Sequence, residues 1–153
     1  MFHRFRFESE FYSALSRVPL HVRMKLDLTG VKISLEDWLS FDFVERSALC
    51  HLPADTEDEA HVFVSYLDYL SRKHRGRNVA RTAPLASTAW DTDGVVPAPV
   101  AQQGTAGQQL VSAEEWTRWK PHQRYALYKT ALSKNDPEGF FALLRELRER
   151  RSR

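Results

Sequence analysis

Apolar residues recur at helical spacing near the start of the chain. Four of them fall at i, i+4, i+7 and i+8 and predict a short amphipathic helix that ends before Pro19, namely Phe7, Phe11, Ala14 and Leu15. Val18-Pro19 predicts a second helix, because proline at the first helical position gives up an amide that has no partner there. Gly30 is expected in the left-handed conformation just beyond its end.

Further along, the same pattern of apolar and polar positions occurs twice. The segment 33–38, Ile-Ser-Leu-Glu-Asp-Trp, is matched 78 residues later by 111–116, Val-Ser-Ala-Glu-Glu-Trp. Arg46 and Arg124 follow at the same spacing, each eight residues after the tryptophan. We interpret this as an internal duplication, and a repeat of this kind constrains the whole fold.

Helix start signals support the duplication. In four places a capping residue is followed three residues later by a carboxylate, namely Ser34 with Asp37, Asp42 with Glu45, Thr56 with Glu59, and Ser112 with Glu115. In the fifth, Pro121 takes the first helical position and Gln123 the third. A longer helix closes each copy. Its apolar stripe is Val62, Phe63, Tyr66, Leu67 and Leu70 in the first copy, and Phe140, Phe141, Leu144 and Leu147 after Asp136-Pro137-Glu138 in the second.

These signals predict an all-α fold in a single domain, 1–153. Two pseudo-repeats of short helices, about 18–70 and 96–147, are joined by an irregular linker, 71–95. Short helices cannot bury their apolar stripes alone, so we expect the copies to pack across a pseudo-twofold axis and share a core. The run Pro97 to Gln103 is expected to be a weak copy of the second helix because of Pro99, Gly104 and Gly107.

Trp38 and Trp116 are expected to be equivalent core anchors, together with Arg124. For Arg46 and Arg124 two roles stay open. The guanidinium can bond loop carbonyls while its stem lies along the indole, or it can contact a ligand or partner. Arg23 and Lys25 are expected to face water.

Composition limits the choice of function and compartment. The 153 residues carry 22 Lys and Arg against 20 Asp and Glu, so the formal charge of +2 favours neither nucleic acid nor an acidic membrane. The single cysteine, Cys50, excludes an internal disulfide and fits a reducing compartment. Charged residues interrupt the apolar ones at 1–7, and no run approaches about 18 apolar residues. We therefore expect a cytoplasmic protein with no membrane partner.

Catalytic and metal signals are weak. Potential metal ligands gather at Cys50, His51, Asp55, Glu57, Asp58, Glu59 and His61, but their spacing does not fit a zinc site and the acids already cap a helix. Cys50 would need a base beside it, and His51 on a helix points about 100° away. No phosphate loop, carboxylate pair or dinucleotide fingerprint occurs. The sequence predicts no cofactor, no metal and no enzymatic activity.

Nucleic-acid binding is the alternative from another class. Each copy has the outline of a helix-turn-helix, and a basic run follows the first copy at Arg72, Lys73, Arg75, Arg77 and Arg81. The second helix, 43–49, has one arginine among several apolar residues, which suits burial. DNA or RNA is therefore an unlikely partner on these residues.

A wider set of motifs follows one order along the chain. From Phe5 to Pro53 these are Phe-x-Phe-Glu, Leu-x-x-Val-Pro, Val-Arg-x-Lys-Leu-Asp, Gly-Val-Lys-Ile-Ser-Leu, Trp38, Arg46-x-x-Leu49 and Leu52-Pro53, and in the second half Val96-Pro97, Trp116 and Gln123-Arg124-Tyr125-Ala126-Leu127-Tyr128-Lys129. In this order the sequence resembles the nitrate reductase-associated protein family. Pro99, Gly104 and Gly107 depart from the pattern.

The resemblance implies a non-catalytic accessory protein of nitrate assimilation. Such a protein would bind the catalytic subunit of nitrate reductase and assist its maturation or the loading of its molybdenum cofactor. The contact positions carried over from the matching motifs are Arg23, Lys25, Asp27, Lys32, Trp38 and Arg46, of which Trp38 is also expected to be a structural anchor. The charges of Arg23-x-Lys25-x-Asp27 are replaced by Ala101, Gln103 and Thr105 in the second copy. This asymmetry suggests that the first half carries the partner-binding face.

Overall fold

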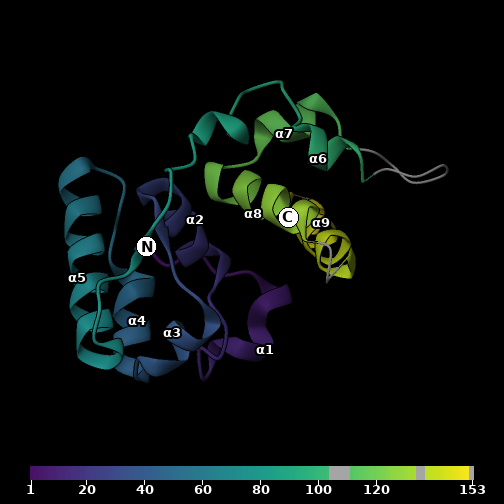
Figure 1. The fold of residues 1–153 in the computed structure, drawn as a ribbon. Helices are drawn as coiled ribbons and strands as arrows, with labels where there is room; N and C mark the ends of the chain where they lie inside the picture. Colours follow the sequence, from purple (N-terminus) through teal and green to yellow (C-terminus); the bar gives the residue numbers. More distant parts are fainter. Residues whose placement is uncertain (104–110, 134–136, 152–153) are drawn as a thin grey trace. The chain divides into compact units, whose positions relative to one another are not determined.

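The regular secondary structure of the chain is almost entirely helical (Figure 1). The structure is a computed structural model that describes residues 1–103, 111–133 and 137–151. Its helices are α1 (Ser9–Tyr12), α2 (Leu20–Thr29), α3 (Leu35–Ser40), α4 (Phe43–His51), α5 (Glu57–Arg75), α6 (Ala98–Ala101), α7 (Ala113–Arg118), α8 (Pro121–Leu132) and α9 (Pro137–Arg151), with 3-10 turns η1 (Arg6–Glu8) and η2 (Ser87–Ala89). Among the described residues, the only strands are β1 (Val31–Lys32) and β2 (Ala80–Arg81), an antiparallel pair. The all-α prediction is confirmed.

The fold divides into two compact units. Unit 1 contains Met1–Arg4 and Glu8–Ala86, and unit 2 contains Phe5–Phe7 and Ser87–Arg153. Along the chain, the short N-terminal segment of unit 2 is therefore separated from the rest of that unit by residues 8–86 of unit 1. That the two copies share one core stays a prediction.

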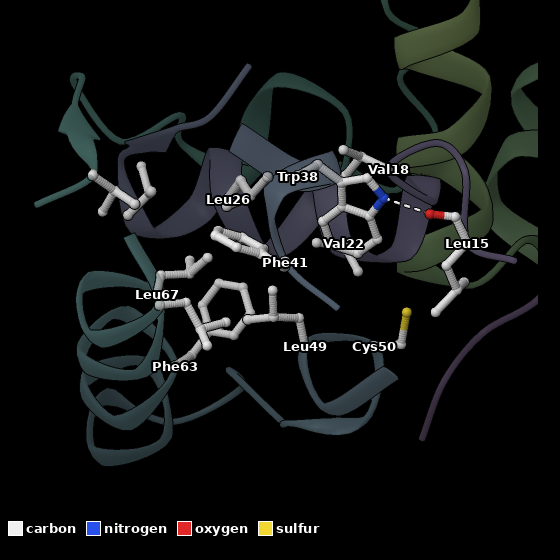
Figure 2. Packing of buried hydrophobic residues seen from close by; sticks show 13 residues of the cluster. Leu15, Val18, Val22, Leu26, Trp38, Phe41, Leu49, Cys50, Phe63 and Leu67 are labelled. Carbon is white, nitrogen blue, oxygen red and sulfur yellow. Dashed lines mark hydrogen bonds between the residues drawn. The ribbon is translucent and has the colours of Figure 1, made fainter. Parts of the chain in front are cut away.

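The core of unit 1 forms between α2, α3, α4 and α5 (Figure 2). Trp38, Phe63 and Leu67 have no exposed surface. They come from α3 and α5, which pack against one another. Val62 differs from the predicted stripe, because it is 54% exposed. It lies one position before Phe63, about 100° around the helix from the buried face.

Helix ends follow the predicted signals. Capping boxes form at Ser34, Asp42, Thr56 and Ser112, where each side chain accepts a hydrogen bond from the main chain three residues later. Pro121 opens α8 as its first residue. Gly30 ends α2 with φ of +73°, and a Cβ atom there would lie 2.6 Å from the carbonyl oxygen of Thr82. Only glycine fits this turn without displacing the neighbouring chain.

The predicted first helix is shorter than its apolar spacing suggests. Helix continues only to Tyr12, and Leu15 takes a positive φ of 49°. This conformation turns the chain out of the helix, and it places the Leu15 oxygen 2.7 Å from Nε1 of Trp38. At the other end of unit 1, α5 runs on to Arg75 and so includes the first residues of the predicted linker.

Corresponding elements recur in both units at the spacing of the sequence repeat. The helices α2 and α6, α3 and α7, and α4 and α8 each begin 78 residues apart. Three buried pairs of α5 and α9 lie 77 residues apart, Phe63 and Phe140, Leu67 and Leu144, and Leu70 and Leu147. The weak second helix of unit 2 is only Ala98–Ala101. Gly104, Gly107 and Asp136, which entered the predictions for unit 2, lie outside the described residues.

Candidate partner-binding surface

In unit 1, hydrogen bonds from Trp38 and Arg46 connect the loop before α2 with α3 and α4. The indole Nε1 of Trp38 donates to the carbonyl oxygen of Leu15 at 2.7 Å, inside the core (Figure 2). Arg46 donates from Nε to the oxygen of Trp38 at 3.1 Å and from Nη2 to that of Leu39 at 2.8 Å. Its Nη1 reaches the oxygen of Ala14 at 3.2 Å. The guanidinium thus satisfies carbonyls at the end of a short helix, which have no partner within it.

Unit 2 repeats these bonds with one change of chemistry. Nε of Arg124 donates to the oxygen of Trp116 at 2.9 Å, and Nη2 donates to that of Thr117 at 2.9 Å. The remaining contacts are ion pairs, 2.8 Å to Asp91 and 2.7 Å to Asp93. Arg124 is 5% exposed, so it is a buried cation that carboxylates of its own unit balance.

Sequence reasoning missed the part of the predicted linker that completes unit 2. Trp90 is 1% exposed, and its carbonyl oxygen accepts the indole N–H of Trp116 at 3.1 Å. Its ring lies edge-on to Tyr125, with centroids 5.0 Å apart. A tryptophan followed by two aspartates inside an Ala, Thr and Ser-rich stretch was the available signal, because such a large apolar ring is rarely left in a solvated linker.

Lys25 does not face water, and the prediction that it does is wrong. It is 4% exposed, and its Nζ donates to the carbonyl oxygens of Leu49 and Leu52, both at 2.6 Å. Burial lowers its pKa to about 8, and the negative charge of Asp55 opposes this shift. The ammonium closes the C-terminal end of α4, where unpaired carbonyls and the helix dipole favour a cation. A surface contact with a partner is therefore not open to Lys25.

The second unit fills the position of Lys25 with Gln103. Its Nε2 donates to the carbonyl oxygen of Ala131 at 3.1 Å, near the end of α8. Both side chains thus serve the same end of corresponding helices. An uncharged glutamine in the second copy thus caps the helix end that lysine caps in the first. The charge asymmetry at this position therefore does not indicate a partner-binding face.

The other three carried-over positions lie along α2 and β1. Arg23 is exposed, and its Nε donates to the oxygen of Val18 at 3.1 Å. Asp27, one turn further along α2, is half-buried, and its main-chain oxygen accepts from the amide of Leu85 at 2.8 Å. Lys32 is exposed on β1. Arg23, Asp27 and Lys32 thus keep surface within reach of a partner, and a binding role for them stays a prediction.

A buried carboxylate organises the contact of α4 with the end of α5. Glu45, whose side chain is 8% exposed, accepts from Nζ of Lys73 at 2.9 Å and pairs with Nε2 of His74 at 2.8 Å. It also accepts from the amide of Asp42 at 2.8 Å as part of the capping box. Burial raises the pKa of Glu45, but these hydrogen bonds outweigh it and bring the pKa down to about 2.

The basic run after the first copy is largely engaged within unit 1. Besides Lys73 with Glu45, its members pair in Arg72 with Asn78, Arg75 and Arg77 with Asp37, and Arg81 with Asp68. Phosphate contacts need cations that can leave their present partners. The nucleic-acid alternative therefore gains no support from this run.

Several large apolar side chains are exposed on the helices of unit 1. They are Leu35 and Leu39 on α3, Phe43 and Val44 on α4, and Val62 and Tyr69 on α5, between 46% and 75% exposed. The expectation that the helix 43–49 is buried holds for Leu49 but not for Phe43 and Val44. Large apolar residues grouped on capped helices are a common feature of protein-binding surfaces.

The candidate catalytic and metal residues remain without a supporting arrangement. Cys50 is buried, and burial raises its pKa to about 12, so the thiolate needed for nucleophilic chemistry is disfavoured. Within the described residues, no three His, Cys, Asp or Glu side chains lie together so that they could hold a metal ion. No helix among those residues is both long and apolar enough to cross a bilayer.

The fold is that of an all-α protein of two compact units, with exposed apolar side chains on α3, α4 and α5. The chain belongs to the family of conserved nitrate reductase-associated proteins, whose family model matches residues 4–147. The resemblance predicted from the sequence motifs is thereby confirmed. Neither a curated protein nor a solved structure gives a significant match.

Proposed function

We propose that this protein is a non-catalytic accessory protein of nitrate assimilation that binds the catalytic subunit of nitrate reductase in the cytoplasm. Through this complex it assists maturation of the enzyme or loading of its molybdenum cofactor. The observation that carries the proposal is the family match over residues 4–147, since the family is described by its association with nitrate reductase.

Surface chemistry supports a binding role. Val44 is 75% exposed and Phe43 51% exposed, on a helix whose start is fixed by a capping box. Rigid helices lose little conformational entropy when they bind, so apolar side chains presented on them are effective contacts. Arg23 and Lys32 on α2 and β1 would supply polar contacts in the same unit.

The test is co-purification of the tagged full-length chain with the catalytic subunit from cells grown on nitrate. We expect the subunit to be retained, and we expect cells without the protein to hold reductase with less activity and less bound molybdenum. An unchanged molybdenum content with a stable complex would remove the maturation role alone. Retention of the subunit no greater than by an unrelated tagged protein, together with normal reductase activity in cells without the protein, would remove the proposal as a whole.

A further inference from the structure

The N-terminal segment Phe5–Phe7 is docked on α8 and α9 of unit 2. Phe5 is 2% exposed, and its ring centroid lies 6.1 Å from that of His122 on α8. The amide of Phe7 donates to Oε1 of Glu146 at 3.1 Å, and Arg6 pairs with Glu149, both acids lying on α9. A short aromatic–basic–aromatic segment therefore covers this pair of helices.

The corresponding positions of unit 1 are uncovered. At the spacings of the repeat, His122 corresponds to Val44, Glu146 to Tyr69 and Glu149 to Arg72. Tyr69 is 51% exposed where Glu146 is 4% exposed, and Val44 is 75% exposed. We call Val44, Tyr69 and Arg72, together with Phe43, the α4–α5 surface.

This correspondence rests on geometry as well as on sequence. The helices α4 and α8 begin at equivalent residues, and Arg46 and Arg124 make the same two main-chain bonds at their starts. The buried faces of α5 and α9 match at three leucine or phenylalanine positions. In both units the two helices pack against each other. The α4–α5 surface is thus the counterpart of a face that already receives a peptide segment.

The chemistry of the α4–α5 surface selects a different segment. Tyr69 lies stacked with Tyr66, their centroids 6.3 Å apart, which offers a flat aromatic platform. Where unit 2 presents Glu149 to a basic residue, unit 1 presents the exposed Arg72. Arg72 donates to the neutral side-chain oxygen of Asn78 at 2.8 Å, whereas Lys73 beside it is paired with the carboxylate of Glu45. The residue between the two aromatics should therefore be acidic. The chain's own segment from a second copy would bring Arg6 against Arg72, which like charge disfavours.

We infer that the α4–α5 surface is the docking site for an aromatic–acidic–aromatic segment of the partner protein. Val44 and Phe43 would cover the first ring, Tyr69 would stack on the second, and Arg72 would pair with the carboxylate. The inference deepens the proposed function and rests on it for the identity of the partner as nitrate reductase.

Two capped synthetic peptides test the chemistry on the full-length protein, one with Phe-Glu-Phe and one with Phe-Arg-Phe at its centre. We expect the acidic peptide to shift the NMR signals of Val44 and Tyr69 and to bind about two- to fivefold more tightly than the basic one. Arg72→Glu should reverse this preference, and Val44→Glu should abolish binding. Val95→Glu is the matched control, because Val95 is also an exposed valine (56%) but lies in unit 2, outside α4 and α5. It should leave binding unchanged.

Several results would overturn the inference. Tighter binding of the basic peptide would assign the surface to the N-terminal segment of a second copy, and equal loss with Val95→Glu would show that no defined site exists on α4 and α5. Co-purification separates this inference from the proposed function. If the reductase is retained equally by the wild type, Val44→Glu and Arg72→Glu, the surface is not its docking site although the function stands. If the peptide binds as expected but no reductase is retained, the proposed function fails and the peptide site remains.

Discussion

The Nε–H of Arg124 donates a 2.9 Å hydrogen bond to the main-chain oxygen of Trp116, eight residues earlier. Arg46 makes the same bond to Trp38 at 3.1 Å. Each arginine therefore links the end of one short helix to the helix that follows. The two differ in what surrounds the rest of the guanidinium, since Arg46 meets carbonyl oxygens and Arg124 meets two carboxylates.

That difference predicts that replacing the two arginines lowers the free energy of unfolding by different amounts. Arg124→Met should lower the free energy of unfolding by about 3 kcal/mol, because it leaves the half-buried Asp91 without its counter-charge. Arg46→Met should cost about 1 to 2 kcal/mol, because only neutral carbonyls lose a donor and some of them can reach water. Urea denaturation of both variants measures the difference. Equal costs would contradict the role assigned to the aspartates.

Acid should weaken the protein through Glu45. Its pKa is about 2 in the folded chain against an ordinary value of 4.5, so the unfolded chain takes up this proton first as the pH falls. The resulting stabilisation, on the order of 2 kcal/mol, is complete above about pH 5 and is lost toward pH 2. Glu45→Gln should flatten stability over this range. The variant keeps the helix cap, since Gln123 at the corresponding position of α8 accepts from Lys120 in the same way. An unchanged pH profile would contradict the prediction.

Lys25 should be required as a hydrogen-bond donor rather than as a surface charge. Lys25→Met leaves the oxygens of Leu49 and Leu52 without their donor inside the fold and should cost on the order of 2 kcal/mol. Lys25→Gln should cost less, because glutamine serves the corresponding helix end in unit 2. Thermal and urea unfolding at neutral pH rank the two variants. A Met variant as stable as the wild type would refute the capping role.

The Cys50 thiol should be unreactive as long as unit 1 stays folded. Its pKa of about 12, against an ordinary value of 9.0, leaves roughly a thousandfold fewer thiolates at pH 8, and the side chain is fully buried. Labelling with a thiol-specific disulfide reagent should therefore be slow in buffer and fast in denaturant. Because the chain has a single cysteine, the labelling rate reports the opening of unit 1 alone. Rapid labelling of the native protein would show that the site is open.

Features decided by neighbours in sequence could be predicted. Ser34, Asp42, Thr56 and Ser112 form their capping boxes because each needs only a main-chain amide three residues away. Gly30 was equally readable, since a left-handed helix end is a local property. The two tryptophans share a spacing with their arginines, which marks each as a structural pair in the sequence itself.

Features decided by the rest of the fold were out of reach. A lysine is nearly always exposed, and only the unpaired end of α4 makes burial of Lys25 favourable. Phe43 and Val44 have the composition of a core helix, yet the buried face of α4 is the one that carries Glu45 and Leu49. For the candidate site this means that the sequence pointed mainly to charged residues of α2, whereas the exposed apolar side chains lie on α3, α4 and α5.

The close packing at Gly30 makes the irregular stretch around Thr82 and Pro84 a structural part of unit 1. Its carbonyl accepts from the amide of Thr82 at 2.9 Å, and a single hydrogen atom in place of a side chain lets Thr82 and Pro84 close over the end of α2. Any larger residue at position 30 would displace Thr82 and Pro84 from the end of α2, together with the neighbouring β1–β2 pair. Replacing residues 79–85 with a flexible spacer would therefore remove a packed part of unit 1 and not merely a connection between its neighbours.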